Sequence, residues 1–120
     1  MIDNIGGIEL DPDTYLLAKS NLFVWTNKLL PNIFNSDTLR NVNSHNNENQ
    51  KILDAVNKKY DIIMANPPFG IKRIDYKNIK SDIKDHYIPF ESKNAVLLFL
   101  QVIIYMLKVN GRAAIVLPDG

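Results

Sequence analysis

Apolar runs and helical spacings alternate along the chain. Short apolar runs predict strands at residues 5–10, 32–35, 60–65 and 112–117. Longer apolar or periodic stretches predict helices from residue 11 to about residue 27, from 51 to 58 and from 94 to 108. Strands that alternate with helices are typical of an open, mostly parallel α/β sheet with right-handed crossovers.

The first helix has the clearest start signal. Asp11 is a favourable N-cap residue, and Pro12 stands where a missing N–H costs nothing. Pro31 blocks any continuation beyond residue 27. Four residues recur at helical spacing and predict a buried stripe: Tyr15, Ala18, Leu22 and Trp25.

The second half of the chain holds the two most apolar segments. Four consecutive apolar residues within 60–65 predict a strand covered on both faces, as in a parallel sheet. The helix over 94–108 is expected to be buried and to close at Asn110-Gly111 with a left-handed turn.

The remaining segments carry weaker signals. The Asn-rich stretch 41–50 predicts a mobile loop, and the charged stretch 71–93 an irregular, solvated one. The short helix over 51–58 is expected to turn three side chains inward: Ile52, Leu53 and Val56.

Composition narrows the class of protein. The 120 residues include 14 Lys and Arg against 13 Asp and Glu, and no cysteine. We therefore expect one domain over residues 1–120 and exclude a mainly electrostatic grip on nucleic acid, a disulfide scaffold and a thiolate site. No His pair has metal-ligand spacing, so no metal is expected. The apolar run 95–107 is too short to span a bilayer, and we expect a cytoplasmic protein without membrane contact.

The sharpest local feature is the sequence Asn66-Pro67-Pro68-Phe69-Gly70 directly after a predicted strand. In open α/β sheets, ligands bind beyond the carboxyl ends of strands. The two prolines stiffen this corner, since each fixes φ and restricts the residue before it. A bare Pro-Pro pair would merely end a strand, but the flanking Asn and Phe favour a binding corner.

The groups on this corner suit a planar substrate with an NH₂ group. The Asn66 amide oxygen and the backbone carbonyls can accept both amino protons, which frees the nitrogen lone pair for attack on an electrophile. Phe69 offers a flat face, and stacking a base on an aromatic ring contributes about 1–3 kcal/mol.

Two acidic residues also follow predicted strands. Glu9 ends the first strand, where a carboxylate can accept hydrogen bonds from both hydroxyls of a ribose, and Leu10 beside it could pack on an adenine ring. Asp37 follows the second strand and could accept a bond from an adenine amino group. Taken singly, each is more often a solvated acid or a turn residue.

These stretches together resemble one family. Residues 61–70, ending in Asn66-Pro67-Pro68-Phe69, resemble the catalytic motif of the modification (methyltransferase) subunit of type I restriction-modification systems, which are N6-adenine DNA methyltransferases. Residues 7–12 resemble the family's second strand and helix, and residues 111–120 resemble its fifth-strand region.

The resemblance implies a partial Rossmann-like methyltransferase fold that uses S-adenosylmethionine. Asn66, Pro67, Pro68 and Phe69 would form the catalytic corner, with Asn66 and Pro67 on the target amine and Phe69 stacked on the flipped base. The cofactor would be held by a second set of residues: Glu9, Leu10, Asp37 and Asn66. The implied partners are adenine-containing DNA and the specificity and restriction subunits of a type I system.

The chain also departs from the family pattern. Nothing in it matches the Gly-rich first strand, and the sixth and seventh strands are missing, so the resemblance implies a central fragment that is inactive in isolation. The strands at 5–10 and 60–65 would lose a shared neighbour, and we expect them to pair directly or to recruit a second copy of the chain as a homodimer.

Two other functions stay open at this point. Related Asn-Pro-Pro-aromatic loops methylate protein glutamine amides or guanine amines in RNA. The chain could also be a non-catalytic remnant that binds partner subunits.

Overall fold

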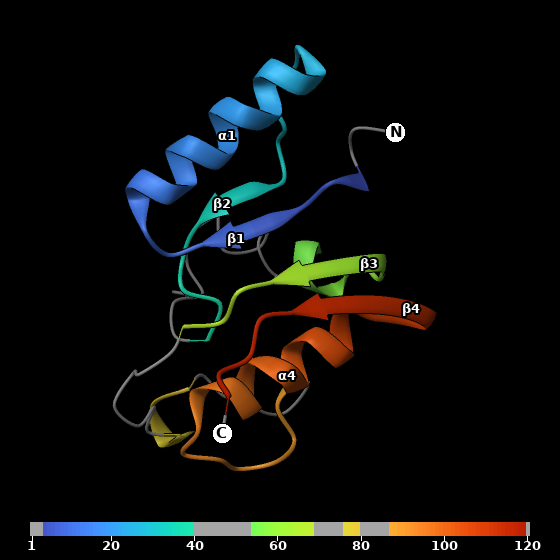
Figure 1. The fold of residues 1–120 in the computed structure, drawn as a ribbon. Coiled ribbons are helices and arrows are strands. Elements are labelled where there is room, and N and C mark those ends of the chain that lie inside the picture. The colour runs from blue at the N-terminus through green and yellow to red at the C-terminus, as the bar shows by residue number, and fades with distance from the viewer. Residues whose placement is uncertain (1–3, 40–53, 69–75, 80–86, 120) are drawn as a thin grey trace. The chain divides into compact units, whose positions relative to one another are not determined.

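The computed structural model describes residues 4–39, 54–68, 76–79 and 87–119 (Figure 1). The chain divides into two compact units, Met1–Asn57 and Lys58–Gly120. All four predicted strands are present, and both two-stranded sheets are parallel, which confirms the α/β class. The prediction of one domain over residues 1–120 stays a prediction.

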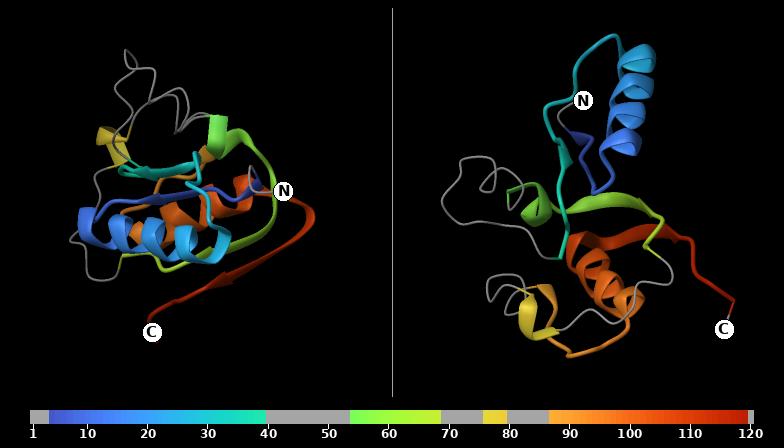
Figure 2. Two further views of the ribbon diagram at one scale, coloured as in Figure 1. Left: turned by 90° about the horizontal axis from the view of Figure 1, so that it is seen from above. Right: turned by 90° about the vertical axis from the view of Figure 1, so that its left-hand side faces the viewer.

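The first unit is built on strands β1 (Gly7–Glu9) and β2 (Ile33–Asn35). They pair in parallel, with Gly7 opposite Ile33 and Glu9 opposite Asn35. Helix α1 (Pro12–Thr26) connects them and contacts both. Figures 1 and 2 show α1 on one side of the two strands, as expected for a β-α-β crossover.

The predicted start of α1 is confirmed. The backbone N–H of Thr14 donates to Asp11 Oδ2 at 2.8 Å, so Asp11 is the N-cap, and Pro12 is the first helical residue. The helix ends at Thr26, and the C-cap Asn27 adopts a left-handed φ of 52° and donates its N–H to the carbonyl of Phe23 at 2.7 Å.

The predicted stripe on α1 is correct in part. Tyr15, Ala18 and Leu22 are half-buried, but Trp25 is 90% exposed, so its predicted burial is wrong. A 15-residue helix is about 22 Å long, whereas a three-residue strand covers about 10 Å. Figure 1 shows α1 running away from β1 and β2 toward its C-terminal end, where the two short strands cannot cover the last turn.

The second unit pairs strand β3 (Tyr60–Ala65) with strand β4 (Leu107–Ile115), again in parallel. Helix α4 (Ala95–Met106) runs directly into β4. Asn94 caps α4, since its Oδ1 accepts from the N–H of Val96 at 2.9 Å. A short 3₁₀ helix, η2 (Tyr76–Asn78), precedes α4 in the chain.

The predicted end of the last helix is wrong. Asn110 does adopt a left-handed conformation, with φ of 67°, but α4 ends at Met106 and Asn110 lies inside β4. While β3 advances from Tyr60 to Ile62, β4 advances from Leu107 to Arg112, so β4 carries three more residues over this step. The turn at Asn110 absorbs them within a strand rather than closing a helix.

The core of the second unit extends into the segment 71–93. Ile79, Tyr87 and Ile88 are buried there, although the sequence predicted a solvated loop. The Tyr76 hydroxyl donates to the carbonyl of Ile88 at 2.8 Å and holds two parts of this segment together. Four α4 residues are buried as well: Ala95, Leu98, Val102 and Ile103. A buried side chain of this kind contributes about 1.5–3 kcal/mol relative to an exposed one.

Strand β3 is not covered on both faces, contrary to the prediction. Ile62 and Met64 share one face and are exposed, Met64 to 82%, whereas Ile63 and Ala65 on the other face are half-buried. In the described part of the second unit, α4 is the helix that packs on this sheet, so one face stays open.

The strands at 5–10 and 60–65 belong to different units, so their expected closure, by direct pairing or by a second copy of the chain, stays a prediction. Strand β1 is hydrogen-bonded to β2, and β3 to β4, and these are the pairings of the described strands. Several predicted features lie outside the described residues: the loop 41–50, Ile52, Leu53, Phe69 and Gly70. Residues 54–57 are helical, and Val56 is buried as predicted.

Candidate functional site

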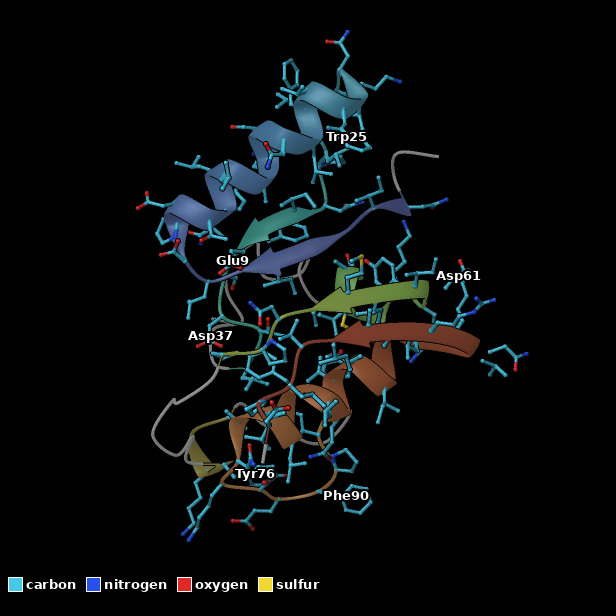
Figure 3. The ribbon with its side chains drawn as sticks, in the orientation of Figure 1. Glu9, Trp25, Asp37, Asp61, Tyr76 and Phe90 are labelled. Atoms are coloured by element: carbon cyan, nitrogen blue, oxygen red, sulfur yellow. The ribbon has the colours of Figure 1, made fainter. Side chains whose placement is uncertain are left out.

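Glu9 and Asp37 lie at the same edge of the first unit. Glu9 is the last residue of β1, and Asp37 follows the last residue of β2 with Ser36 between them. Because β1 and β2 are parallel, their carboxyl ends meet at one edge of the sheet. Figure 3 shows both labelled side chains beyond these strand ends, as the sequence predicted.

The Glu9 carboxylate is oriented by the first turn of the crossover. Its Oε1 accepts from the backbone N–H of Asp11 at 2.8 Å, and the side chain is half-buried. Oε2 makes no hydrogen bond within the described ranges, and an ionised carboxylate has capacity for several donors. Leu10, the next residue, is 59% exposed and presents an apolar side chain at the same edge.

Asp37 is anchored in a comparable way. Its Oδ1 accepts from the N–H of Leu39 at 2.8 Å, which forms a local turn closed by the aspartate side chain. Leu39 is 1% exposed, so this turn is tied to the core of the first unit. Asp37 therefore has a defined position at the edge, and its side chain is half-buried.

Asn35 is a residue at this edge that sequence reasoning missed. Its Nδ2 donates to the carbonyl of Glu9 at 2.8 Å and to the carbonyl of Leu10 at 2.9 Å. The N–H of Ser36 also donates to the carbonyl of Glu9, at 3.0 Å. The available signal was a polar residue directly after two apolar residues at the end of a predicted strand, which is too common to single out without the register.

The N-cap of α1 completes the edge. Hydrogen bonds from Thr14, its side chain first and its backbone N–H second, hold the pKa of Asp11 below its ordinary value near 3.8. Asp11 is therefore ionised at neutral pH and accepts from the helix N-terminus, while its own N–H serves Glu9.

The proline corner follows β3 in the second unit. The N–H of Val116 donates to the carbonyl of Ala65 at 3.0 Å, so the pairing with β4 continues up to the corner. Asn66 is exposed, Pro67 is buried and Pro68 is half-buried. Within the described ranges the Asn66 side chain makes no hydrogen bond, which leaves its amide available to a ligand.

Other kinds of site find no support in the described residues. No three His, Asp or Glu side chains in residues 4–39, 54–68, 76–79 and 87–119 are grouped to hold a metal ion. The helices in those ranges are too short or too polar to cross a membrane.

Nearly the whole chain matches one protein family. Residues 3–120 match the family described as N-6 DNA methylase. The chain belongs to this family.

Two curated relatives of this N-6 DNA methylase chain are methylase subunits of type I restriction enzymes. The EcoEI subunit of Escherichia coli is 38% identical over 78 residues, which are 63% of this chain and 14% of the relative. The HindI subunit of Haemophilus influenzae (strain ATCC 51907 / DSM 11121 / KW20 / Rd) is 29% identical over 117 residues, which are 98% of this chain and 24% of the relative. The chain thus spans a quarter or less of either relative. No solved structure matches it.

Proposed function

We propose that this chain supplies the cofactor edge and the target-base corner of a DNA adenine-N6 methyltransferase in a type I restriction-modification system. The observation that carries the proposal is the Asn66 side chain, exposed and without a hydrogen bond in the described ranges, at the carboxyl end of a parallel strand. Family membership and the names of both relatives support DNA as the substrate.

The residues of the first unit fit S-adenosylmethionine, which supplies the methyl group when bound. Glu9 is half-buried and keeps acceptor capacity after its bond to Asp11, as a ribose diol requires. The exposed Leu10 provides an apolar surface for an adenine ring. Asp37, held by Leu39, would accept from the adenine amino group, and Asn66 would also face the cofactor.

The residues of the second unit act on the target amine. The Asn66 side-chain oxygen and the Pro67 carbonyl would accept the two N6 protons of a target adenine. These bonds would draw the nitrogen lone pair out of the ring, so that the nitrogen could take the methyl group as the methyl–sulfur bond of S-adenosylmethionine breaks and S-adenosylhomocysteine is released. Pro68 stiffens the corner, and Phe69 would stack on the flipped base. The proton leaves the nitrogen after transfer, so no side chain with a perturbed pKa is needed.

The wider assignment follows from the same family. The partners would be DNA and the specificity and restriction subunits, and the reaction would take place in the cytoplasm. A homodimer through the unpaired edges of β1 and β3 stays a prediction, which sedimentation of the chain tests directly.

Cofactor binding is the first test, because we expect little or no turnover from the isolated chain. Calorimetry with S-adenosylhomocysteine should give micromolar affinity. Glu9→Gln should weaken it about tenfold, as loss of charge-assisted hydrogen bonds predicts. Absence of binding by the unaltered chain would contradict the proposal and favour a non-catalytic remnant.

The acceptor is tested with tritiated S-adenosylmethionine and adenine-containing DNA, followed by mass spectrometry of the nucleosides. The expected product is N6-methyladenine at low yield, lost in Asn66→Ala. Since Asn66 is exposed and has no partner in the described ranges, this variant should keep its stability within about 0.5 kcal/mol. Label on guanine or on a protein glutamine would assign the other acceptors instead.

A further inference from the structure

We infer that Asn35 is a positioning residue for the proposed cofactor edge, acting through the backbone of Glu9 and Leu10. The inference rests on the proposed function, since it assigns a role toward the same ligand. It adds a residue that neither composition nor motif spacing indicated.

The side chain of Asn35 extends the β1–β2 ladder by one step. Glu9 and Asn35 face each other as the last register pair of the two strands. Beyond that pair, the side-chain amide of Asn35 continues the hydrogen bonding between the strands. Its Nδ2 donates to the Glu9 carbonyl at 2.8 Å and to the Leu10 carbonyl at 2.9 Å. Asn35 lies 26 residues after Glu9 and 25 after Leu10 in the chain. The two bonds therefore attach the turn that follows β1 to the neighbouring strand β2.

The chemistry of the contact requires an amide. Two carbonyl oxygens converge on one nitrogen, and an NH₂ group has one proton for each. A carboxylate in its place would repel both carbonyls, a hydroxyl could serve only one, and an aliphatic side chain neither. The Glu9 carbonyl also accepts from the N–H of Ser36, whereas the Leu10 carbonyl is held by the Asn35 amide.

The held peptides carry the ligand-facing groups. The Glu9 carboxylate accepts from the backbone N–H of Asp11, and the Asp11 side chain in turn caps α1. With the Glu9 and Leu10 carbonyls held, the Glu9 carboxylate is set in place before a ligand arrives. Preorganisation of this kind lowers the cost of ordering the site on binding.

The test compares Asn35→Leu with the same change at Asn4, an exposed residue of the same unit without a side-chain hydrogen bond in the described ranges. Affinity is measured by calorimetry for S-adenosylhomocysteine and for its 2′,3′-dideoxy analogue. Asn35→Leu should weaken the first ligand about tenfold, in line with two lost hydrogen bonds, and change the second by less than about twofold. Asn4→Leu should change neither.

Two further variants separate positioning from general destabilisation. Asn35→Ser keeps one donor and should restore part of the affinity. In the double variant with Glu9→Gln, Asn35→Leu should add less than about twofold, because both changes remove the same ribose contact. Backbone amide exchange should accelerate at Asp11 and Ser36 in Asn35→Leu, while exchange at Ile33 and Phe34 of β2 is unchanged.

The outcomes are distinct. If the unaltered chain binds and Glu9→Gln weakens binding while Asn35→Leu does not, the positioning role is wrong and the proposed function stands. Equal losses for both ligands, or losses that add fully to Glu9→Gln, also overturn the role. If the unaltered chain binds neither ligand, the proposed function fails, and the inference about Asn35 fails with it.

Discussion

Gln101 of α4 holds the backbone of Phe90 with both ends of its side-chain amide. The N–H of Phe90 donates to Gln101 Oε1 at 2.8 Å, and Gln101 Nε2 donates to the Phe90 carbonyl at 2.9 Å. The Phe90 side chain itself is exposed, as Figure 3 shows. The Gln101 side chain thus bonds both backbone groups of Phe90, as a neighbouring strand would, and attaches the segment before α4 to the helix.

Loss of this contact should destabilise the second unit modestly. We expect Gln101→Leu to lower the free energy of unfolding by about 1–2 kcal/mol, since two hydrogen bonds each contribute about 1 kcal/mol. Gln101→Glu keeps the acceptor for the Phe90 N–H and should cost about half as much. Urea denaturation measures both, and equal stability of Gln101→Leu and the unaltered chain would show that the contact contributes nothing.

Gly111 should tolerate no side chain. A Cβ there would lie 2.9 Å from the Lys108 carbonyl oxygen and 3.1 Å from the Tyr60 carbonyl oxygen, and both are backbone atoms. We expect Gly111→Ala to cost about 1–3 kcal/mol, as overpacking does. Gly7→Ala is the matched control, because among the described residues its Cβ would meet the flexible Ile33 Cδ1 at an ordinary contact distance of 3.4 Å. Thermal unfolding of the two variants should therefore differ clearly.

The ion pair between Lys108 and Asp61 should contribute little. The Lys108 Nζ lies 2.8 Å from Asp61 Oδ2, but both side chains are exposed, to 48% and 78%. Exposed pairs typically contribute about 0–1 kcal/mol and weaken with salt. We expect Asp61→Asn to change the unfolding free energy by less than about 1 kcal/mol. A larger loss that persists at high salt would contradict this.

The N-cap of α1 should weaken in acid. Because the pKa of Asp11 is lower in the folded chain than in the unfolded one, its contribution is fully present above the ordinary value near 3.8. The contribution is lost as the pH falls through the depressed folded value. Amide exchange at Thr14, measured across this acidic range, should accelerate relative to the middle of α1. Asn at this position caps without a charge, so Asp11→Asn should remove the pH dependence.

Trp25 should report an aqueous environment. It is the single tryptophan of the chain and is 90% exposed, so its fluorescence should be red-shifted and fully quenched by iodide. Shielded, blue-shifted emission would mean that the last turn of α1 is covered in solution, as the helical spacing first predicted.

Local signals predicted much of the fold because they depend on neighbours in the chain. Asp11 and Pro12 start α1, and Asn66-Pro67 ends β3, since capping and proline geometry act over a few residues. The left-handed conformation of Asn110 was also predicted from its residue type and the following glycine. The position of Asn110 inside β4 was not predicted. The three extra residues of β4 form a bulge only because of how β4 pairs with β3.

The amino-acid sequence alone was sufficient for the four strands, their alternation with helices, and the placing of Glu9, Asp37 and Asn66 at strand ends, because periodicity and breakers are local properties. Only the tertiary structure showed three features: the exposure of Trp25, the open face of β3 and the hydrogen bond from Asn35 to the Glu9 carbonyl. Each depends on which residues, distant in the chain, lie opposite one another in the fold. The pattern of apolar and polar residues along the chain determines neither the register of strand pairing nor how much of a helix a short sheet covers.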